Sequence, residues 1–143
     1  MQTQLHVQMC ITQGRFSQEV RRAASGLGLL PGQPKVLEYL YEHDGCTQAD
    51  IGEAWLLDKS TVSGLIDRLE RDGLIQSRKD GQDKRRKAIS LTPKGRALWQ
   101  PMQERLSALD EAAWRGVSGA ERAAFLMTLS RIRRNLEEGG GAS

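Results

Sequence analysis

Residues 47–95 carry an uninterrupted series of helix, turn and strand signals, and their order limits the possible folds more than any other feature of the chain. Thr47 and Asp50 have the spacing of a capping box, in which a hydroxyl and a carboxylate each satisfy a free backbone N–H group at a helix start. This spacing predicts a short helix from Thr47 to about Trp55.

A second helix follows almost at once. Only Leu56 and Leu57 separate the first helix from Asp58, whose carboxylate can cap the next one. So short a link forces the two helices to cross at a steep angle, which is the helix-turn-helix geometry. We expect the second helix at about residues 58–72, with one buried stripe of apolar residues at helical spacing: Val62, Leu65, Ile66 and Leu69.

The face of the second helix opposite this stripe is polar and rich in small residues. Hydroxyl groups and a glycine let a backbone lie deep in a groove and offer hydrogen-bonding groups to base edges and phosphates. A polar helix face is by default only solvated, but the surrounding helix-turn-helix favours contact with DNA. The predicted DNA contacts of the two helices are Gln48, Lys59, Ser60, Thr61, Ser63, Gly64, Asp67 and Arg68.

A β-hairpin is predicted after the second helix, at about residues 75–91. Gly73 ends the helix because glycine accepts a left-handed conformation, and residues 87–91 place apolar side chains at alternate positions. Thr92 can then cap a further helix with Pro93 at its first position. The hairpin is the wing of a winged helix-turn-helix, with predicted DNA contacts at Arg78, Lys79, Asp83, Lys84, Arg85, Arg86 and Lys87.

Positive charge is concentrated in the same segment. Residues 59–96 hold eleven Lys or Arg and five Asp or Glu, a net charge of +6, whereas the whole 143-residue chain carries only +3. The remaining residues are therefore net negative. A local basic segment beside a groove-sized helix predicts phosphate neutralisation and salt-sensitive binding to double-stranded DNA.

The motifs of roughly residues 33–95 match a known pattern. They are Gln33-Pro34-x-Val36-Leu37, Thr47-Gln48-x-x-Ile51, Leu57-Asp58-Lys59-Ser60-Thr61-Val62, Leu65-x-Asp67-Arg68-Leu69-x-x-x-Gly73-Leu74-Ile75 and Asp83-x-Arg85-x5-Leu91-Thr92-x-x-Gly95. Together they resemble the multiple antibiotic resistance regulator (MarR) family of bacterial transcription factors.

The resemblance implies a homodimer in which each subunit has one winged helix-turn-helix and a dimer domain built from the first and last helices. Such regulators are usually repressors of nearby genes, released by small phenolic or lipophilic ligands, metals or oxidants. The resemblance also implies that Asp83 steadies Arg85 as an arginine inserted into the minor groove, with Arg86 as a competitor for that role.

Two positions depart from the family pattern. Leu56 stands where a glycine is common, and a left-handed conformation at this residue would cost on the order of 1 kcal/mol. The turn is therefore slightly different, or the strain is absorbed by packing. Gly52 stands where alanine is usual, and either lowers helix propensity or permits close helix packing.

The expected fold is mainly α-helical with one small β-hairpin. We expect an N-terminal dimerisation helix within residues 1–30, the DNA-binding lobe at 31–96, C-terminal dimerisation helices at 97–138 and a disordered tail at 139–143. The apolar faces of the outer helices have no evident partner in one small lobe, so pairing of two copies would bury them. These faces carry Leu5, Met9, Phe16, Val20, Ala24 and Leu27 at one end, and Phe125, Leu129, Ile132 and Leu136 at the other.

Three further helix features are expected. Ser118 and Glu121 form a second capping box at the start of the last helix. Pro101 lies inside the long helix after Thr92 and predicts a kink near residues 97–101. The inner faces of two helices are predicted to carry Val36, Leu37, Leu40 and Tyr41, and Leu98, Met102, Leu106, Leu109 and Ala113.

The two histidines and two cysteines permit a different hypothesis. His6 and Cys10 are four residues apart on one helix, and His43 and Cys46 are three apart near a helix junction, and these four side chains are the candidate ligands of a metal or thiol sensor. The competing interpretation is structural: Cys46 fills an apolar position before Thr47, and Cys10 is a small core residue. We assign no metal or cofactor site.

The remaining function classes are weakly supported. The chain shows no catalytic triad, phosphate loop or zinc-hydrolase motif, so we expect no enzyme activity. No apolar segment approaches the ~20 residues that span a bilayer, which favours a cytoplasmic protein without membrane contact. The alternatives to a ligand-released DNA-binding repressor are a winged-helix protein-interaction module and the thiol or metal sensor. The run from Lys84 to Lys87, four successive cations, favours DNA over a protein partner.

Overall fold

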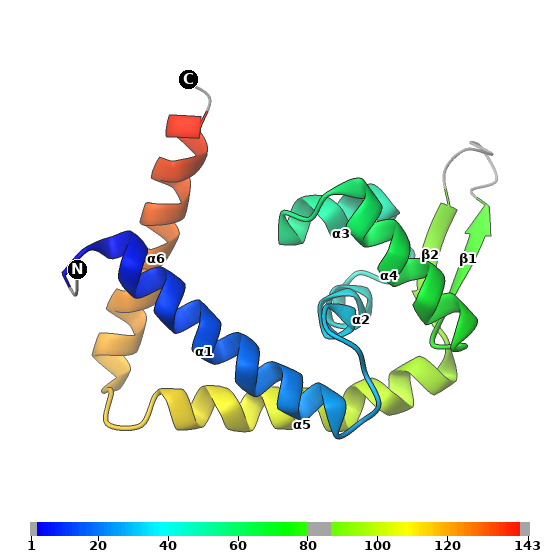
Figure 1. Ribbon diagram of the computed structural model, residues 1–143, viewed down its shortest axis with the longest axis horizontal. Helices are drawn as coiled ribbons and strands as arrows, with labels where there is room; N and C mark the ends of the chain where they lie inside the picture. The colour runs from blue at the N-terminus through cyan, green and yellow to red at the C-terminus, as the bar shows by residue number, and fades with distance from the viewer. Residues whose placement is uncertain (1–2, 80–86, 141–143) are drawn as a thin grey trace. The chain divides into compact units, whose positions relative to one another are not determined.

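The computed structural model describes residues 3–79 and 87–140 and contains six helices and one antiparallel hairpin in these ranges (Figure 1). The mainly α-helical winged fold is therefore confirmed. The elements are α1 Leu5–Ser25, α2 Gln33–Glu42, α3 Gln48–Trp55, α4 Lys59–Arg71, β1 Ile75–Lys79, β2 Lys87–Leu91, α5 Pro93–Ala113 and α6 Gly119–Gly140.

The chain divides into two compact units, residues 1–107 and residues 108–143. In the first unit, α2, α3, α4 and the hairpin pack around one core together with the first half of α5. Each helix of this lobe contributes residues that are almost fully buried. They include Val36, Leu37, Leu40, Ile51, Val62, Ile66, Leu69, Ile89, Trp99 and Met102.

Two expectations for buried faces were wrong. Tyr41 is 45% exposed, and it is Tyr39 that packs against the core and stacks on His43, with the ring centroids 4.2 Å apart. Ala113, expected on the inner face of α5, is exposed. The buried Trp99 was missing from the expected face of α5, because periodicity marks a stripe but does not tell how wide the stripe is.

The hairpin is held to the lobe by a contact that the pattern of helices and strands did not predict. In its register Ile75 pairs with Leu91, and Ser77 pairs with Ile89. Ile89 also forms an isolated bridge to Cys46, whose carbonyl oxygen accepts a hydrogen bond of 2.7 Å from the Ile89 N–H. The base of the hairpin is therefore anchored to the segment that leads into α3.

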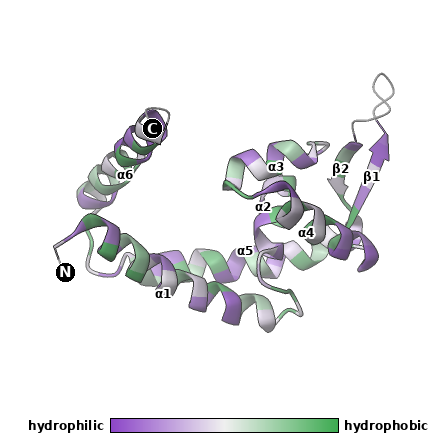
Figure 2. Ribbon diagram, turned by 45° about the horizontal axis from the view of Figure 1, so that its top comes forward, coloured by the Kyte–Doolittle hydropathy of each residue, from purple (hydrophilic) through white to green (hydrophobic). Residues whose placement is uncertain are grey.

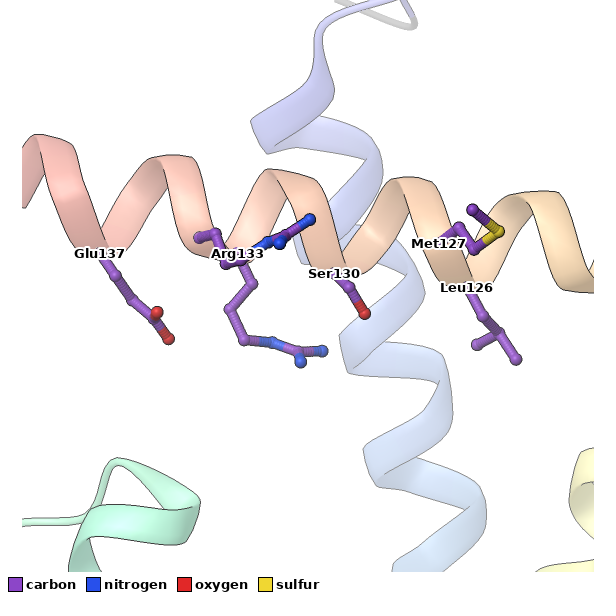
Figure 3. A pocket seen from close by; sticks show the side chains of 6 residues that line it. Leu126, Met127, Ser130, Arg133 and Glu137 are labelled. Atoms are coloured by element: carbon purple, nitrogen blue, oxygen red, sulfur yellow. The ribbon is translucent and has the colours of Figure 1, made fainter.

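The second unit contains the end of α5 and all of α6. The expected capping box is present: the Glu121 N–H donates to Ser118 Oγ (3.2 Å) and the Ser118 N–H donates to Glu121 Oε1 (3.3 Å). Trp114 meets Phe125 edge to face, with the ring centroids 6.0 Å apart. None of the residues Gly119–Gly140 is buried, and Figure 3 shows Leu126 and Ser130 projecting from one side of α6.

Two other expectations concern α5 and the end of the chain. Pro101 lies inside α5, which continues as a helix through it, and the expected kink stays a prediction. The helix α6 extends through Gly140, so residues 139 and 140, which we expected in the tail, are helical. None of the helices in the described part of the chain has the combined length and apolarity needed to cross a bilayer.

Gly95 is predicted to be required for the junction between the hairpin and α5. A Cβ atom at this position would overlap the backbone carbonyl oxygen of Leu74, and a backbone atom cannot rotate away as a side chain can. We expect Gly95→Ala to lower the free energy of unfolding by about 1–3 kcal/mol in urea titrations. The control is Gly64→Ala, where no atom lies within 4 Å. This control should gain about 0.5–1 kcal/mol from helix propensity, and a loss as large as that of Gly95→Ala would contradict the steric explanation.

Candidate DNA interface

The turn between α3 and α4 is tight because the start of each helix is capped and one glycine lets them approach. The Asp50 N–H donates to Thr47 Oγ1 (3.2 Å) and the Thr47 N–H donates to Asp50 Oδ2 (2.9 Å), which confirms the predicted capping box. A Cβ atom on Gly52 would lie 3.1 Å from the Leu57 carbonyl oxygen. Gly52 therefore permits close packing at the turn, one of its two expected roles.

Leu56 adopts the left-handed conformation at this turn, with φ 53° and ψ 46°. Its side chain is 82% exposed, so packing does not absorb the strain of this conformation. The turn thus takes a left-handed conformation without glycine, the residue that suits it best. The cost is local, because the buried residues on either side keep both helices in place.

Replacement of Leu56 should therefore stabilise the protein. We expect Leu56→Gly to raise the free energy of unfolding by roughly 0.5–1 kcal/mol, because it relieves a left-handed residue and loses little buried area. Leu56→Ala keeps the Cβ atom and should give no comparable gain. Equal gains in both variants, measured by urea titration at one protein concentration, would point to the exposed apolar surface instead of the backbone.

The rotation of α4 exposes the face predicted to meet DNA. Val62, Ile66 and Leu69 are buried, and Leu65 is half-buried with its side chain beside Gly32. Gln48 and Ser63 are half-buried, and the Gln48 amide donates to the Lys59 carbonyl oxygen at 3.4 Å. The other predicted contacts of α4 are exposed: Lys59, Ser60, Thr61, Gly64, Asp67 and Arg68.

Asp58 organises the N-terminus of α4. Its Oδ1 accepts hydrogen bonds from the Thr61 N–H (2.7 Å) and the Ser60 hydroxyl (2.8 Å), and its Oδ2 accepts one from the Thr61 hydroxyl (2.9 Å). The Thr61 N–H, followed by the two hydroxyls, holds the pKa of the Asp58 carboxyl below its usual value. The carboxylate is therefore charged at neutral pH. Sequence reasoning found the cap but missed the two hydroxyl donors.

Asp72 forms an exposed ion pair with Arg68 at the other end of α4, with Nε and Oδ2 3.3 Å apart. A pair this exposed contributes little to stability, but it limits the positions of the Arg68 guanidinium. Arg68 itself is exposed on the outer face of α4.

The hairpin lies beside α4 (Figure 1) and carries further cations. Arg78, Lys79 and Lys87 are exposed, and Lys79 pairs directly with Lys87 at the end of the ladder. Like charges opposite each other on a ladder are unfavourable, which a nearby anion would relieve. The remaining predicted contacts of the wing lie outside the described residues; these are Asp83, Lys84, Arg85 and Arg86.

A groove of about 800 Å³ lies between α3, α4 and the hairpin. Asp50, Glu53, Asp67 and Glu70 line it together with Lys59 and Lys87. Four carboxylates make its interior unsuited to phosphate. Among the predicted DNA contacts, Asp67 thus lies at an acidic groove, and Gln48, Lys59 and Lys87 line the same groove.

The histidines and cysteines do not assemble into a metal site. No three His, Cys, Asp or Glu side chains within residues 3–79 and 87–140 form a group that could hold a metal ion. Cys10 is exposed, contrary to the core position expected for it, and His6 is exposed as well. Cys46 is buried as expected, and burial, aided by the Asp50 carboxylate, raises the pKa of its thiol to about 11. His43 stacks on Tyr39.

Cys46 should consequently be a poor thiol for sensing oxidants. The raised pKa lowers its thiolate fraction at pH 8, and the thiolate is the reactive form. In a Cys10→Ser variant we expect Cys46 to react with a disulfide reagent at least about 100-fold more slowly in the native protein than in urea. Its rate should rise as the pH approaches 11. Similar rates in the native and denatured protein would refute this assignment.

Comparisons with known proteins agree with this geometry. A family model described as the MarR family matches residues 27–86. YybA, an uncharacterized HTH-type transcriptional regulator of Bacillus subtilis, is 31% identical over 111 residues, which make up 78% of this chain and 74% of YybA. NicR, an HTH-type transcriptional repressor of Pseudomonas putida, is 29% identical over 71% of this chain and 64% of its own length.

Solved structures extend the likeness to most of the chain. A MarR family regulator from Silicibacter pomeroyi has 30% identity and a TM-score of 0.79, covering 90% of this chain and 86% of its own. The chain belongs to the MarR family of transcriptional regulators. The S. aureus MepR–DNA complex has 27% identity and a TM-score of 0.86, covering 93% and 98% of the two chains. Bordetella bronchiseptica BpsR, whose DNA binding is regulated by 6-hydroxynicotinic acid, has 27% identity and a TM-score of 0.83, covering 92% and 94%.

Proposed function

We propose that this MarR family protein is a homodimeric repressor that binds a pseudo-palindromic operator through α4 and the hairpin. The observation that carries the proposal is the outer face of α4. Exposed hydroxyls and Gly64 lie on it between Lys59 and Arg68, and the exposed Arg78 and Lys79 lie on the adjacent strand. Such a face suits a major groove, and two copies of α4 would enter successive grooves about one helical turn (~34 Å) apart.

The dimer is supported by apolar surface that one copy leaves uncovered. Leu5, Met9 and Phe16 of α1 are 40–53% exposed, and Phe125 and Leu136 of α6 are 53% and 71% exposed. Figure 2 shows hydrophobic residues along α1 and along α6, interleaved with hydrophilic ones. A helix with no buried residue, such as α6, gains little from its own chain, because most helical stability comes from packing. A second copy of the same chain would bury both faces.

An effector site is supported by a groove of about 470 Å³ along α1 and the start of α2. Its apolar lining includes Phe16 and Val20, and Arg21 and Lys35 add positive charge. An aromatic ring with an acidic substituent matches this combination. We propose that such a small phenolic or lipophilic ligand releases the protein from DNA by favouring a spacing of the two α4 helices that no longer fits the operator.

The test is selection of bound fragments from random and genomic DNA at two salt concentrations, with the mass of the protein in solution measured alongside. The proposal requires enrichment of one inverted-repeat motif by a dimer, and weaker binding at higher salt. Recovery of no motif would instead favour a protein-interaction role for the winged fold. A monomer that selects a single half-site would refute the dimeric mechanism.

Arg85 is proposed to enter the minor groove. We expect Arg85→Ala to weaken binding to the selected operator by about 1–3 kcal/mol, because a narrow minor groove has an enhanced negative potential that favours a guanidinium. Arg86→Ala is the matched control, and it should lose less affinity and mainly reduce the salt dependence. If Arg86→Ala causes the larger loss, the two roles are exchanged. Affinities are measured by fluorescence anisotropy with one labelled operator.

A further inference from the structure

The hydroxyl groups of Ser60 and Thr61, at the start of α4, both donate their protons to hydrogen bonds within the protein. The Ser60 hydroxyl lies 2.8 Å from Asp58 Oδ1, and the Thr61 hydroxyl lies 2.9 Å from Asp58 Oδ2. An ionised carboxylate has no proton to give and can only accept. Both hydroxyls must therefore be the donors, and hydrogen bonds to an ionised acceptor are among the stronger ones.

What Ser60 and Thr61 can still offer to a ligand is therefore limited to lone pairs. Both residues are exposed on the outer face of α4, and a hydroxyl whose single proton is engaged has only acceptor capacity left. The nearby Thr61 N–H, which could otherwise hold a phosphate, also donates to Asp58 at 2.7 Å. With the Asp58 charge beside them, these hydroxyls are poor partners for phosphate and good partners for a hydrogen-bond donor.

The donors that DNA presents in its major groove are the amino groups of adenine (N6) and cytosine (N4). Guanine and thymine present acceptors on that edge: N7 and O6 for guanine, and O4 for thymine. Every base pair contains one base of each kind, so an acceptor on the protein distinguishes the two strands of a pair. Such an acceptor discriminates A·T from T·A more strongly than A·T from C·G, because adenine and cytosine both present an amino group on the contacted strand.

We propose, on the basis of the DNA-binding function argued above, that Asp58 is a positioning residue that makes Ser60 and Thr61 readers of base amino groups. The operator position that they contact should carry adenine or cytosine on the contacted strand and discriminate against guanine and thymine. Asp58 determines this base preference by making the two hydroxyls hydrogen-bond acceptors, and it does not itself contact DNA.

The experiment compares the motifs selected from random DNA by the wild-type chain and by Ser60→Ala, Thr61→Val and Asp58→Asn, with thermal stability recorded for each. Asparagine is as good an N-cap as aspartate, so α4 should keep its start. Its amide group has one acceptor oxygen and donates through nitrogen, which frees at least one hydroxyl proton to face the DNA. Glu70→Gln removes the same charge from the far end of α4 and serves as the control.

We expect Ser60→Ala or Thr61→Val to reduce the preference for adenine or cytosine at one position by roughly five- to tenfold, the effect typical of one lost base contact. Asp58→Asn should bring guanine or thymine into the motif at that same position, which a purely structural cap would not do. Glu70→Gln should leave the base preference unchanged.

Four outcomes would overturn the inference. If Ser60→Ala and Thr61→Val both select the wild-type motif, the inference is refuted while the proposed function stands. The same follows if these variants lose a preference for guanine or thymine. The same holds if Asp58→Asn, folded as judged by its melting temperature, selects the wild-type base at the affected position. Failure of the wild-type chain to enrich any motif overturns the proposed function, and this inference with it.

Discussion

Burial of one apolar stripe of α4 determines which face of this helix the DNA-binding lobe exposes to solvent. Val62, Ile66 and Leu69 are 5% exposed or less, and burial of each such side chain contributes about 1.5–3 kcal/mol. The exposed Arg68–Asp72 pair on the same helix contributes at most about 1 kcal/mol. The core therefore sets the rotation of α4 about its axis, and the polar face, with its hydroxyls and cations, is outermost as a consequence.

The features predicted from the sequence are those with a local physical cause. The caps at Thr47, Asp58 and Ser118 each join groups three residues apart, and such spacings are visible in a sequence. The bridge between Cys46 and Ile89 joins segments 43 residues apart, and no periodicity indicates it. The hydroxyl contacts of Asp58 are local, but they depend on side-chain rotamers that a capping pattern does not specify.

At the turn between α3 and α4, two residues differ from the family pattern, Gly52 and Leu56, and they have opposite effects on the strain of the turn. Because Gly52 has no side chain, the backbone of Leu57 can come close to it. The Gly52 carbonyl oxygen accepts a hydrogen bond of 2.9 Å from the Leu57 N–H. Leu56 takes the left-handed conformation that a glycine would adopt without strain. The packing of α3 against α4 is thus maintained by buried residues on both helices and does not depend on the residue in the turn.

The junction between α4 and α5 makes the DNA-binding face and the long helix move together. Three consecutive carbonyl oxygens after α4 accept hydrogen bonds from the start of α5: Asp72 from Lys94 Nζ (2.9 Å), Gly73 from the Thr92 hydroxyl (2.6 Å), and Leu74 from the Thr92 N–H (3.1 Å). Each such bond contributes about 1 kcal/mol, and the close approach of Gly95 to Leu74 leaves no room for sliding. A force that tilts the first turns of α5 must therefore carry α4 with it, because separating them breaks all three bonds. Under the release mechanism proposed above, this connection would let an effector that acts on helices outside the lobe reposition α4 without deforming the face that meets DNA.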